Sequence, residues 1–299
     1  MYNPVLNAGD RLLFYRKNCL QHSPTYKRAS TNMKIYGRIL IMVLIAFTAS
    51  SCISAKSENS LLIFAAASMT DVLNEIMDEY ENQNAGVEII FNYGGSQSLA
   101  AQLNQGAPGD MFISAGSDPV DFLIRSENVE LTPKYEIASN RLVIVTQLQN
   151  DLLIRLDGLQ NMRRIAIADP DLAPAGSYAR EALQNVGLWD SLSKNIVLAP
   201  DARATLNYVK TGNVDAGIVY YTDALSVPDL KKTELIPTDS YRNISYPVVI
   251  PVEGVNSTRA MHLAEFLHGE FSRMTLEKYG FVVPKLQPNS TFEVDRKDD

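Results

Sequence analysis

The sequence predicts an α/β protein of two lobes that are joined by two crossing strands. Short apolar runs alternate with longer segments whose apolar residues recur every three or four positions, the pattern of strands followed by amphipathic helices. Such a rhythm indicates mixed, mainly parallel sheets flanked by helices. The series occurs twice, before and after residue 140, which predicts two sheets. With 299 residues, of which 46% are hydrophobic, the chain is long enough to bury two cores.

The first series occupies residues 61–126. Its strands are expected at 61–66, 87–91 and 111–114, and its helices at 70–82, 98–105 and 119–126. The strand at 61–66 is apolar throughout, as expected for a strand that is buried on both faces. In the helix at 70–82, apolar residues from Val72 to Met77 share one face, which would pack on the sheet.

The second series starts after residue 140. Its strands are expected at 141–145, 164–168, 196–198 and 216–220, and its helices at 177–186 and 202–211. A further strand at 246–250 leads back toward the first lobe, and an amphipathic helix follows it. We therefore assign 61–140 and 251–284 to the first lobe, 141–250 to the second and 285–299 to a polar tail. The hinge strands are expected near 140–146 and 246–251.

Residues 1–52 are predicted to be an N-terminal extension and an export signal. Lys34 and Arg38 precede an apolar run at 39–47, and small residues follow it. A basic flank, a short apolar core and small residues are typical of export signals, and the run is shorter than the ~18 residues of a membrane span. The basic flank lies beside Met33, which favours Met33 over Met1 as the start of translation.

Cys52 follows three small residues and is similar to the cysteine of a bacterial lipoprotein box. This similarity predicts a lipidated Cys52 that anchors the protein to the membrane. The alternative is free secretion after cleavage near Ala55. In either case the mature protein works outside the inner membrane, in the periplasm or at the cell surface.

Charge and cysteine content exclude several classes of function. The formal net charge is −7, and the chain beyond residue 52 is more acidic still because the preceding segment is basic. Such a surface repels nucleic acid and anionic lipid. The cysteines, Cys19 and Cys52, both precede the folded part, which excludes a disulfide framework and a thiolate metal site there. A small anion would have to be bound by close-range hydrogen bonds.

Four stretches place small residues where a helix should begin after a strand. A helix start carries unpaired N–H donors and a partial positive charge, so it attracts anions without Lys or Arg. Ligands of open α/β sheets bind at the carboxyl ends of the strands. Tyr220 ends an apolar strand and could add a hydroxyl there. The four stretches, which together predict a site for a small oxyanion, are residues 66–71, 94–98, 174–178 and 200–204.

Each stretch also has an ordinary structural explanation. Ser68, three residues before Asp71, could cap a helix, and Ser96 follows two turn-forming glycines. Asp201 is expected to be an N-cap and Arg203 a surface charge. If the serines instead bind a ligand, their replacement by alanine should weaken binding and leave the melting temperature of the unliganded protein unchanged.

The residues for catalysis are sparse. His262 and His268 fall on or near the closing amphipathic helix, where a packed or solvated role is expected, and His22 precedes the folded part. The sequence contains no nucleophile elbow, phosphate-loop lysine or His-Glu-x-x-His motif. The carboxylates of Asp169 and Asp171 are expected in a turn. These observations predict a protein that is not an enzyme and needs no cofactor.

Together, these stretches resemble the periplasmic molybdate-binding proteins of ABC transporters, which are type II solute-binding proteins. The resemblance spans residues 61–284 and implies a periplasmic-binding-protein-like fold. It also implies a monomer that binds molybdate, and with it tungstate, and that has an ABC permease as its partner. The segments that carry the resemblance are 64–68, 106–115, 169–170, 174–179, 217–220 and 278–281.

Carried over by position, the resemblance implies that Ser68 and Ser96 bind the oxyanion through hydroxyl and backbone N–H groups. Ala175 and Ala202 would add backbone N–H groups, and Tyr220 its hydroxyl. The family often has a larger aliphatic residue at the position of Ala202. Molybdenum would be held only as part of molybdate. The alternatives are another oxyanion such as sulfate, a ferric complex, an organic anion, or an enzyme on the same fold.

Overall fold

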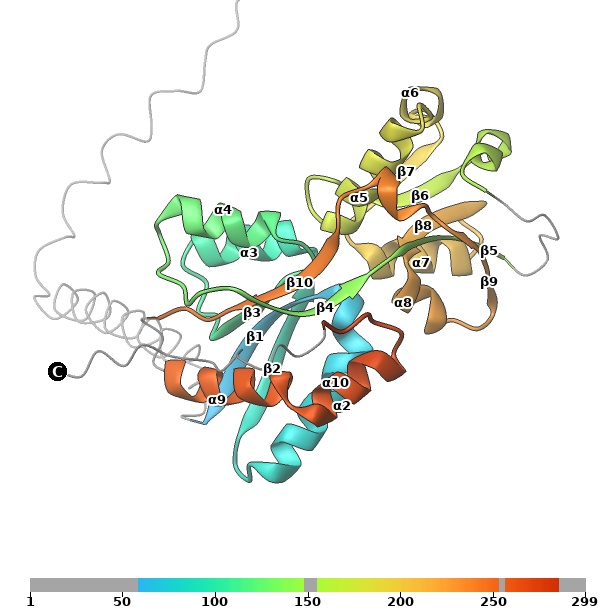
Figure 1. Ribbon diagram of the computed structural model, residues 1–299. Helices are drawn as coiled ribbons and strands as arrows, with labels where there is room; N and C mark the ends of the chain where they lie inside the picture. Colours follow the sequence, from blue (N-terminus) through green and yellow to red (C-terminus); the bar gives the residue numbers. More distant parts are fainter. Residues whose placement is uncertain (1–58, 148–154, 253–255, 285–299) are drawn as a thin grey trace, which may run out of the picture. The chain divides into compact units, whose positions relative to one another are not determined.

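Two sheets of five strands each form the framework of the protein (Figure 1). The computed structural model describes residues 59–147, 155–252 and 256–284. The predicted export signal, Cys52 and the polar tail lie outside these residues. Parallel and antiparallel strands occur in both sheets, which confirms the predicted α/β fold with mixed sheets.

The first lobe is built on the sheet with strand order β2-β1-β3-β10-β4. Strand β1 is parallel to β2 and β3, and β10 is antiparallel to β3 and β4. The strands are β1 (Ser60–Ala66), β2 (Glu88–Gly94), β3 (Met111–Ile113), β4 (Tyr135–Asn140) and β10 (Ile244–Val249).

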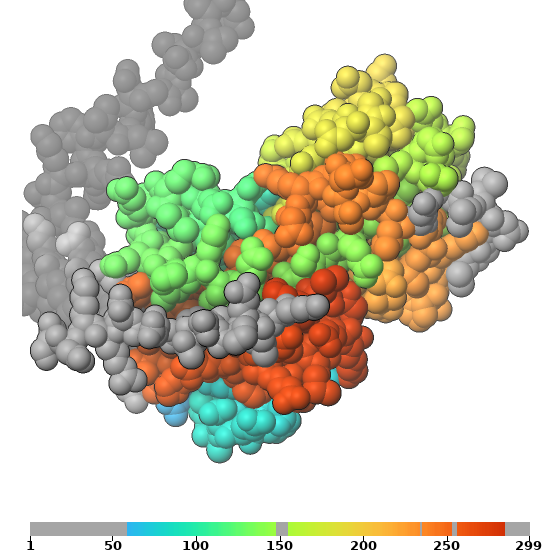
Figure 2. Space-filling model, in the orientation of Figure 1, coloured from blue at the N-terminus to red at the C-terminus, as the bar shows by residue number. Residues whose placement is uncertain are grey.

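Helices cover both faces of this sheet because the side chains of β1 alternate between two cores. Ile63 packs into the core shared with α2, α9 and α10, and Phe64 packs into the core shared with α3 and α4. In the space-filling view the C-terminal helices, in red, lie against α2, in cyan (Figure 2). The helices are η1 (Ala67–Met69), α2 (Thr70–Gln83), α3 (Ser96–Asn104), α4 (Asp118–Ser126), α9 (Ser257–His268) and α10 (Glu270–Lys278).

The second lobe is built on the sheet with strand order β7-β6-β8-β5-β9. Strand β6 is parallel to β7 and β8, and β5 is antiparallel to β8 and β9. Helices α5 and α7 pack into different cores on the two sides of this sheet. Its strands are β5 (Leu142–Gln147), β6 (Ile165–Ala168), β7 (Ile196–Ala199), β8 (Ala216–Tyr220) and β9 (Leu230–Leu235). Its helices are η2 (Asp157–Asn161), α5 (Pro174–Asn185), α6 (Trp189–Leu192), α7 (Ala202–Lys210), α8 (Tyr221–Leu225) and η3 (Thr238–Ser240).

The chain crosses between the two sheets at places that differ in part from the sequence prediction. One residue, Arg141, separates β4 of the first sheet from β5 of the second. The return crossing runs through residues 236–243, and β10 lies wholly in the first sheet. The assignment of residues 244–249 to the second lobe was therefore wrong, because this strand forms its hydrogen bonds with β3 and β4.

Several short helices escaped the sequence analysis, and so did the longer elements β4, β9 and α10. Strands β4 and β9 lie at sheet edges, where one side of the strand has no strand partner, so they lack continuous apolar runs. Helix α10 was not separated from α9, which it follows after Gly269. Within the described residues, no helix has both the length and the apolar character needed to cross a membrane.

Candidate functional site: a pocket of hydrogen-bond donors

All five residues predicted to bind the anion line one small pocket. Ser68 and Ser96 come from the first lobe, and Ala175, Ala202 and Tyr220 come from the second. The pocket is lined by residues 66–68, 94–96 and 115 of the first lobe and by 173–175, 201, 202 and 220 of the second. The structure thus brings together residues that are up to 152 positions apart in the sequence.

The pocket forms where parallel strands end and helices begin. Strand β2 ends at Gly94, and α3 begins at Ser96. In the second lobe, Ala175 is the second residue of α5 and Ala202 is the first residue of α7. The N–H groups in the first turn of a helix have no carbonyl partner within that helix. Three helix starts therefore direct unpaired donors and positive dipole ends toward the same space.

The two serine hydroxyls do not serve as helix caps. No side-chain capping bond is formed at η1, α2 or α3. Instead, Ser96 Oγ accepts a hydrogen bond from the backbone N–H of Ala115 at 3.0 Å. Ser68 Oγ lies 3.3 Å from the hydroxyl oxygen of Tyr246. The capping explanation for Ser68 is therefore wrong. The Ser96 proton remains able to donate into the pocket.

The hydroxyl of Tyr220 is buried in the pocket wall without a partner among the described residues. The residue is only 1% exposed, and its hydroxyl oxygen forms no hydrogen bond with the described part of the chain. Burial raises the pKa of this phenol well above its ordinary value, so it keeps its proton at neutral pH. A buried hydroxyl without a partner costs about 1–3 kcal/mol, so Tyr220 is a candidate donor for a ligand.

No Lys or Arg is among the residues that line the pocket. The charged residue in the lining is Asp201, whose carboxylate accepts the N–H of Ala204 at 2.8 Å. Asp201 is the N-cap of α7, as predicted. A small anion in this pocket would therefore meet neutral donors and no cationic side chain.

Arg203 does not have the predicted role of a surface charge. Its Nη2 lies 2.6 Å from Asp71 Oδ2 of α2, and its Nε lies 3.0 Å from Asp223 Oδ1 of α8. The side chain is 28% exposed, and it forms an ion pair between the two lobes next to Ala202. Sequence reasoning missed this contact because Asp71 lies 132 residues away along the chain.

Asp223 makes the stability of the protein depend on pH. This carboxyl is fully buried, and burial raises its pKa to about 7, against the opposing effect of Arg203. Because the folded protein holds this proton more tightly than the unfolded chain, its free energy of unfolding falls as the pH rises from about 4 to about 7. We expect Asp223→Asn to remove this loss, so that the variant gains stability relative to the wild type across that range. Chemical denaturation of both proteins at several pH values measures the difference between their free energies of unfolding. A difference that does not change with pH would contradict the prediction.

Direct contacts between the lobes border the pocket. The backbone N–H of Ser98 in α3 donates to the carbonyl of Leu172 at 3.2 Å, and Gln97 Nε2 donates to the carbonyl of Pro170 at 3.3 Å. A Cβ atom added to Gly95 would lie 2.3 Å from the Leu172 carbonyl oxygen. The sequence predicted a turn at Gly95, and the structure shows that the second lobe also occupies the space beside this residue.

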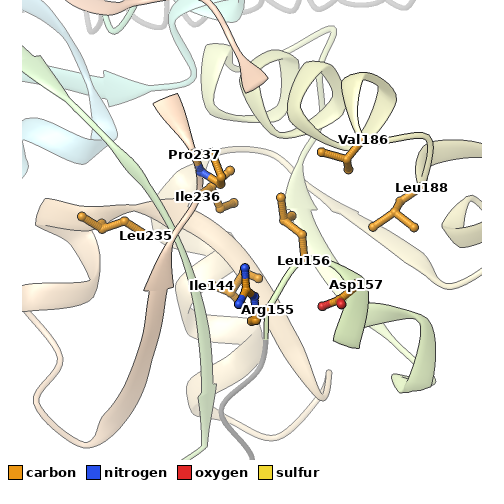
Figure 3. A pocket seen from close by; sticks show the side chains of 9 residues that line it. All are labelled: Ile144, Arg155, Leu156, Asp157, Val186, Leu188, Leu235, Ile236 and Pro237. Atoms are coloured by element: carbon orange, nitrogen blue, oxygen red, sulfur yellow. The ribbon is translucent and has the colours of Figure 1, made fainter. Parts of the chain in front are cut away.

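The pocket is too small for an organic ligand. Its free volume is about 10 Å³, far below the roughly 300–1,000 Å³ of sites for organic ligands. A second pocket, of about 270 Å³, lies within the second lobe (Figure 3). Its lining includes the apolar side chains of Ile144, Leu188 and Ile236 and none of the predicted anion-binding residues. The smaller pocket is therefore the candidate anion site.

The histidines of α9 lie outside the pocket lining. The ring of His268 is centred 4.4 Å from that of Tyr135. Burial, with a smaller contribution from Arg273, lowers the pKa of His268. Within the described residues, no group of three or more His, Cys, Asp or Glu side chains could hold a metal ion.

Comparison with known proteins places the chain in a family. Residues 61–282 match the family described as bacterial extracellular solute-binding protein. The molybdate-binding protein ModA of Escherichia coli (strain K12) is 33% identical over 233 residues, which cover 76% of this chain and 90% of the relative. ModA of Haemophilus influenzae is 30% identical over 225 residues, with coverages of 73% and 88%.

A solved structure shares the fold. The periplasmic molybdate-binding protein of Azotobacter vinelandii aligns with a TM-score of 0.68 and 22% identity, over 75% of this chain and 100% of that chain. The family match covers both sheets and every residue of the pocket lining. The chain belongs to the family of bacterial extracellular solute-binding proteins.

Proposed function

We propose that this protein captures molybdate between its two lobes outside the cytoplasm and delivers it to an ABC permease, and that tungstate is bound in the same way. The observation that carries the proposal is the convergence of neutral donors from both lobes on one small pocket, including the unpartnered hydroxyl of Tyr220. The printed names of the E. coli and H. influenzae relatives support molybdate as the ligand.

The donors offset the cost of removing water from the anion. Hydrogen bonds to a charged group contribute roughly 1.5–3 kcal/mol each. Ser68 and Ser96 can each offer a hydroxyl and a backbone N–H, Ala175 and Ala202 each offer an N–H, and Tyr220 offers its hydroxyl. The molybdenum atom is held only through the oxygen atoms of its oxyanion, and no further cofactor is required.

A pocket made of donors selects against anions that carry a proton. Hydrogen phosphate brings an O–H group, and the carboxylate in the lining, that of Asp201, is already engaged by the N–H of Ala204. An O–H group left without an acceptor costs about 1–3 kcal/mol. Sulfate is fully deprotonated, so only its smaller size can exclude it. Tungstate nearly matches molybdate in size and charge, so the site should accept both.

A binding role is favoured over an enzyme on the same fold. The carboxylate in the lining, that of Asp201, already accepts a backbone N–H, and no histidine is part of the lining. We infer a monomer that binds its ligand without changing it chemically. Incubation with molybdate followed by spectroscopic identification of the anion tests this, and a chemically altered anion would support an enzyme.

The anchoring of the protein is a separate part of the proposal. We infer export and lipidation at Cys52, which would hold the protein at the outer face of the membrane. Mass spectrometry of the exported protein should show a lipid on Cys52 and its loss in Cys52→Ser. A mature chain that starts near Ala55 and carries no lipid would instead support free secretion.

Calorimetric titration with molybdate, tungstate, sulfate and hydrogen phosphate tests the function. We expect strong binding of molybdate and tungstate, weaker binding of sulfate and the weakest binding of hydrogen phosphate. Elemental analysis of protein purified from molybdate-supplemented medium should show molybdenum. Equal or tighter binding of phosphate or sulfate would overturn the assignment.

Replacing Tyr220 with phenylalanine should weaken molybdate binding about 10-fold to 100-fold, because one hydrogen bond to a charged group is lost. The unliganded variant should melt at the same temperature as the wild type or slightly higher, since this hydroxyl has no partner in the described protein. Calorimetry and thermal melting measure the two effects. A clear fall in melting temperature with unchanged affinity would show that the hydroxyl serves the fold and not the ligand.

A further inference from the structure

We propose that Tyr246 and Asn140 are positioning residues that keep the Ser68 hydroxyl proton directed into the pocket, and that they thereby set the preference for oxyanions without a proton. This inference rests on the proposed function. It assigns a role to two residues that do not line the pocket: Asn140, which ends β4 at the first crossing between the sheets, and Tyr246, which lies in β10.

A buried hydrogen-bonded chain lies behind Ser68. Asn140 is the last residue of β4, Tyr246 lies in β10, and Thr222 lies in α8 of the other lobe. Asn140 Nδ2 lies 2.9 Å from the Tyr246 hydroxyl and 2.9 Å from Thr222 Oγ1. The Tyr246 hydroxyl in turn lies 3.3 Å from Ser68 Oγ. Tyr246 is fully buried, and the other three residues are at least 93% buried.

A backbone group fixes the orientation of the Asn140 amide. The N–H of Arg141 lies 2.8 Å from Asn140 Oδ1. Since a backbone N–H can only donate, the side-chain atom that faces it must be the carbonyl oxygen. The amide nitrogen therefore faces Tyr246 and Thr222, and it donates one N–H to each hydroxyl oxygen.

The direction of the next bond follows from burial. The Tyr246 oxygen accepts a hydrogen bond from Asn140, so the Tyr246 hydroxyl must donate its own hydrogen bond to a different acceptor. Burial raises the pKa of this phenol well above its ordinary value, so the proton is retained. Ser68 Oγ is the acceptor that the described structure offers to it. Tyr246 therefore donates to Ser68, and the proton of Ser68 is left to donate into the pocket.

Ser96 has the same arrangement with a different donor. Its oxygen accepts the N–H of Ala115, which also leaves its proton for the pocket. Each serine oxygen thus accepts a hydrogen bond on the side away from the pocket, and each serine hydroxyl can donate a hydrogen bond into the pocket. The bond to Ser68 is long for a pair of hydroxyls, whose usual separation is about 2.5–3.0 Å. We therefore expect its loss to have a moderate effect.

Without the Tyr246 hydroxyl, no donor behind Ser68 would fix its hydroxyl, which could then rotate and turn a lone pair toward the pocket in place of its proton. Ser68 could then accept the O–H of hydrogen phosphate, which the wild-type site leaves unpaired. Tyr246→Phe should weaken molybdate binding about 5-fold and leave hydrogen phosphate binding unchanged or tighter. The preference for molybdate over hydrogen phosphate should fall at least 5-fold. If Tyr246 had a purely structural role, Tyr246→Phe would weaken the binding of both anions equally.

The test compares Tyr246→Phe with the matched variant Tyr93→Phe. Tyr93 lies in the same lobe, and its hydroxyl donates to Asn74 Oδ1 at 2.9 Å and not to Ser68. Molybdate affinity is measured by calorimetry at about pH 8, and hydrogen phosphate affinity by its competition with bound molybdate. The ratio of the two should change in Tyr246→Phe and stay unchanged in Tyr93→Phe. An unchanged ratio in Tyr246→Phe, including a lack of competition by phosphate in both proteins, would overturn the inference.

A second variant keeps the test decisive if Tyr246→Phe is unstable. In Asn140→Asp the new carboxylate accepts a hydrogen bond from the Tyr246 hydroxyl. The Tyr246 oxygen can then only accept a hydrogen bond from the Ser68 hydroxyl. The Ser68 proton is then turned away from the pocket. The added charge repels both dianions, but the ratio of their affinities should still move toward hydrogen phosphate. Failure of the wild type to bind any of the oxyanions would refute the proposed function, whereas normal wild-type selectivity with unchanged ratios in both variants would refute only this inference.

Discussion

Replacing Gly95 with alanine will weaken molybdate binding about 100-fold or more. The added Cβ would lie 2.3 Å from the carbonyl oxygen of Leu172 and 3.0 Å from the Cβ of Ala173, both in the other lobe. The backbone of Gly95 has φ −68° and ψ 132°, which alanine adopts without strain, so the first lobe should fold normally. The methyl group therefore disfavours the closed state, in which the two lobes are in contact beside Gly95. The apparent affinity for molybdate falls in proportion to the population of this state.

The matched control for this experiment is Gly94→Ala. It adds the same methyl group one residue earlier, where the nearest atom is 3.4 Å away in Leu99 of the same lobe. Gly94 also lines the pocket, so its methyl group can cost some affinity, but the loss should be far smaller than in Gly95→Ala because this methyl group meets no atom of the second lobe. Calorimetry gives the affinities, and small-angle X-ray scattering should show that molybdate no longer compacts Gly95→Ala. Wild-type affinity in Gly95→Ala would show that the contact with Leu172 is not needed for binding.

The double variant Ser68→Ala/Ser96→Ala is expected to lose about 1,000-fold in molybdate affinity. Each substitution removes one hydroxyl donor to a charged ligand, worth roughly 1.5–3 kcal/mol. The backbone N–H groups at both positions remain, so measurable binding should survive. Titration of the two single variants and the double variant shows whether the losses add. An affinity within a few-fold of the wild type would refute the role of these hydroxyls.

The unliganded double variant should also melt at a lower temperature, contrary to the expectation from sequence. Ser96→Ala leaves the N–H of Ala115 without its acceptor, and Ser68→Ala does the same to the Tyr246 hydroxyl. A buried donor that loses its acceptor costs about 1–3 kcal/mol. In a domain of this size, each kcal/mol lowers the melting temperature by about 2–4 °C. Tyr220→Phe is the control, because it removes a donor without leaving a protein group unpaired.

Local sequence patterns predicted most of the strands and helices. The β1 run and the apolar face of α2 were recognised because burial on two faces, or on one helical face, imposes a short repeat. The edge strand β9 was missed because its residues, Leu230–Leu235, include charged side chains and meet only one neighbouring strand. The assignment of β10 failed for a related reason. Its apolar run predicts a buried strand but does not determine which of the two sheets the strand joins.

The sequence by itself determined where the donors lie, because small residues at the ends of strands and the starts of helices form a local pattern. Only the tertiary structure decided how these donors act. The partner of Arg203, the buried state of Asp223, the space beside Gly95 and the hydrogen-bonded chain from Asn140 to Ser68 each depend on a contact made by folding. Ser68 and Tyr246 lie 178 residues apart. The direction of a hydroxyl proton depends on neighbours that are distant in the sequence, so a local sequence pattern cannot predict it.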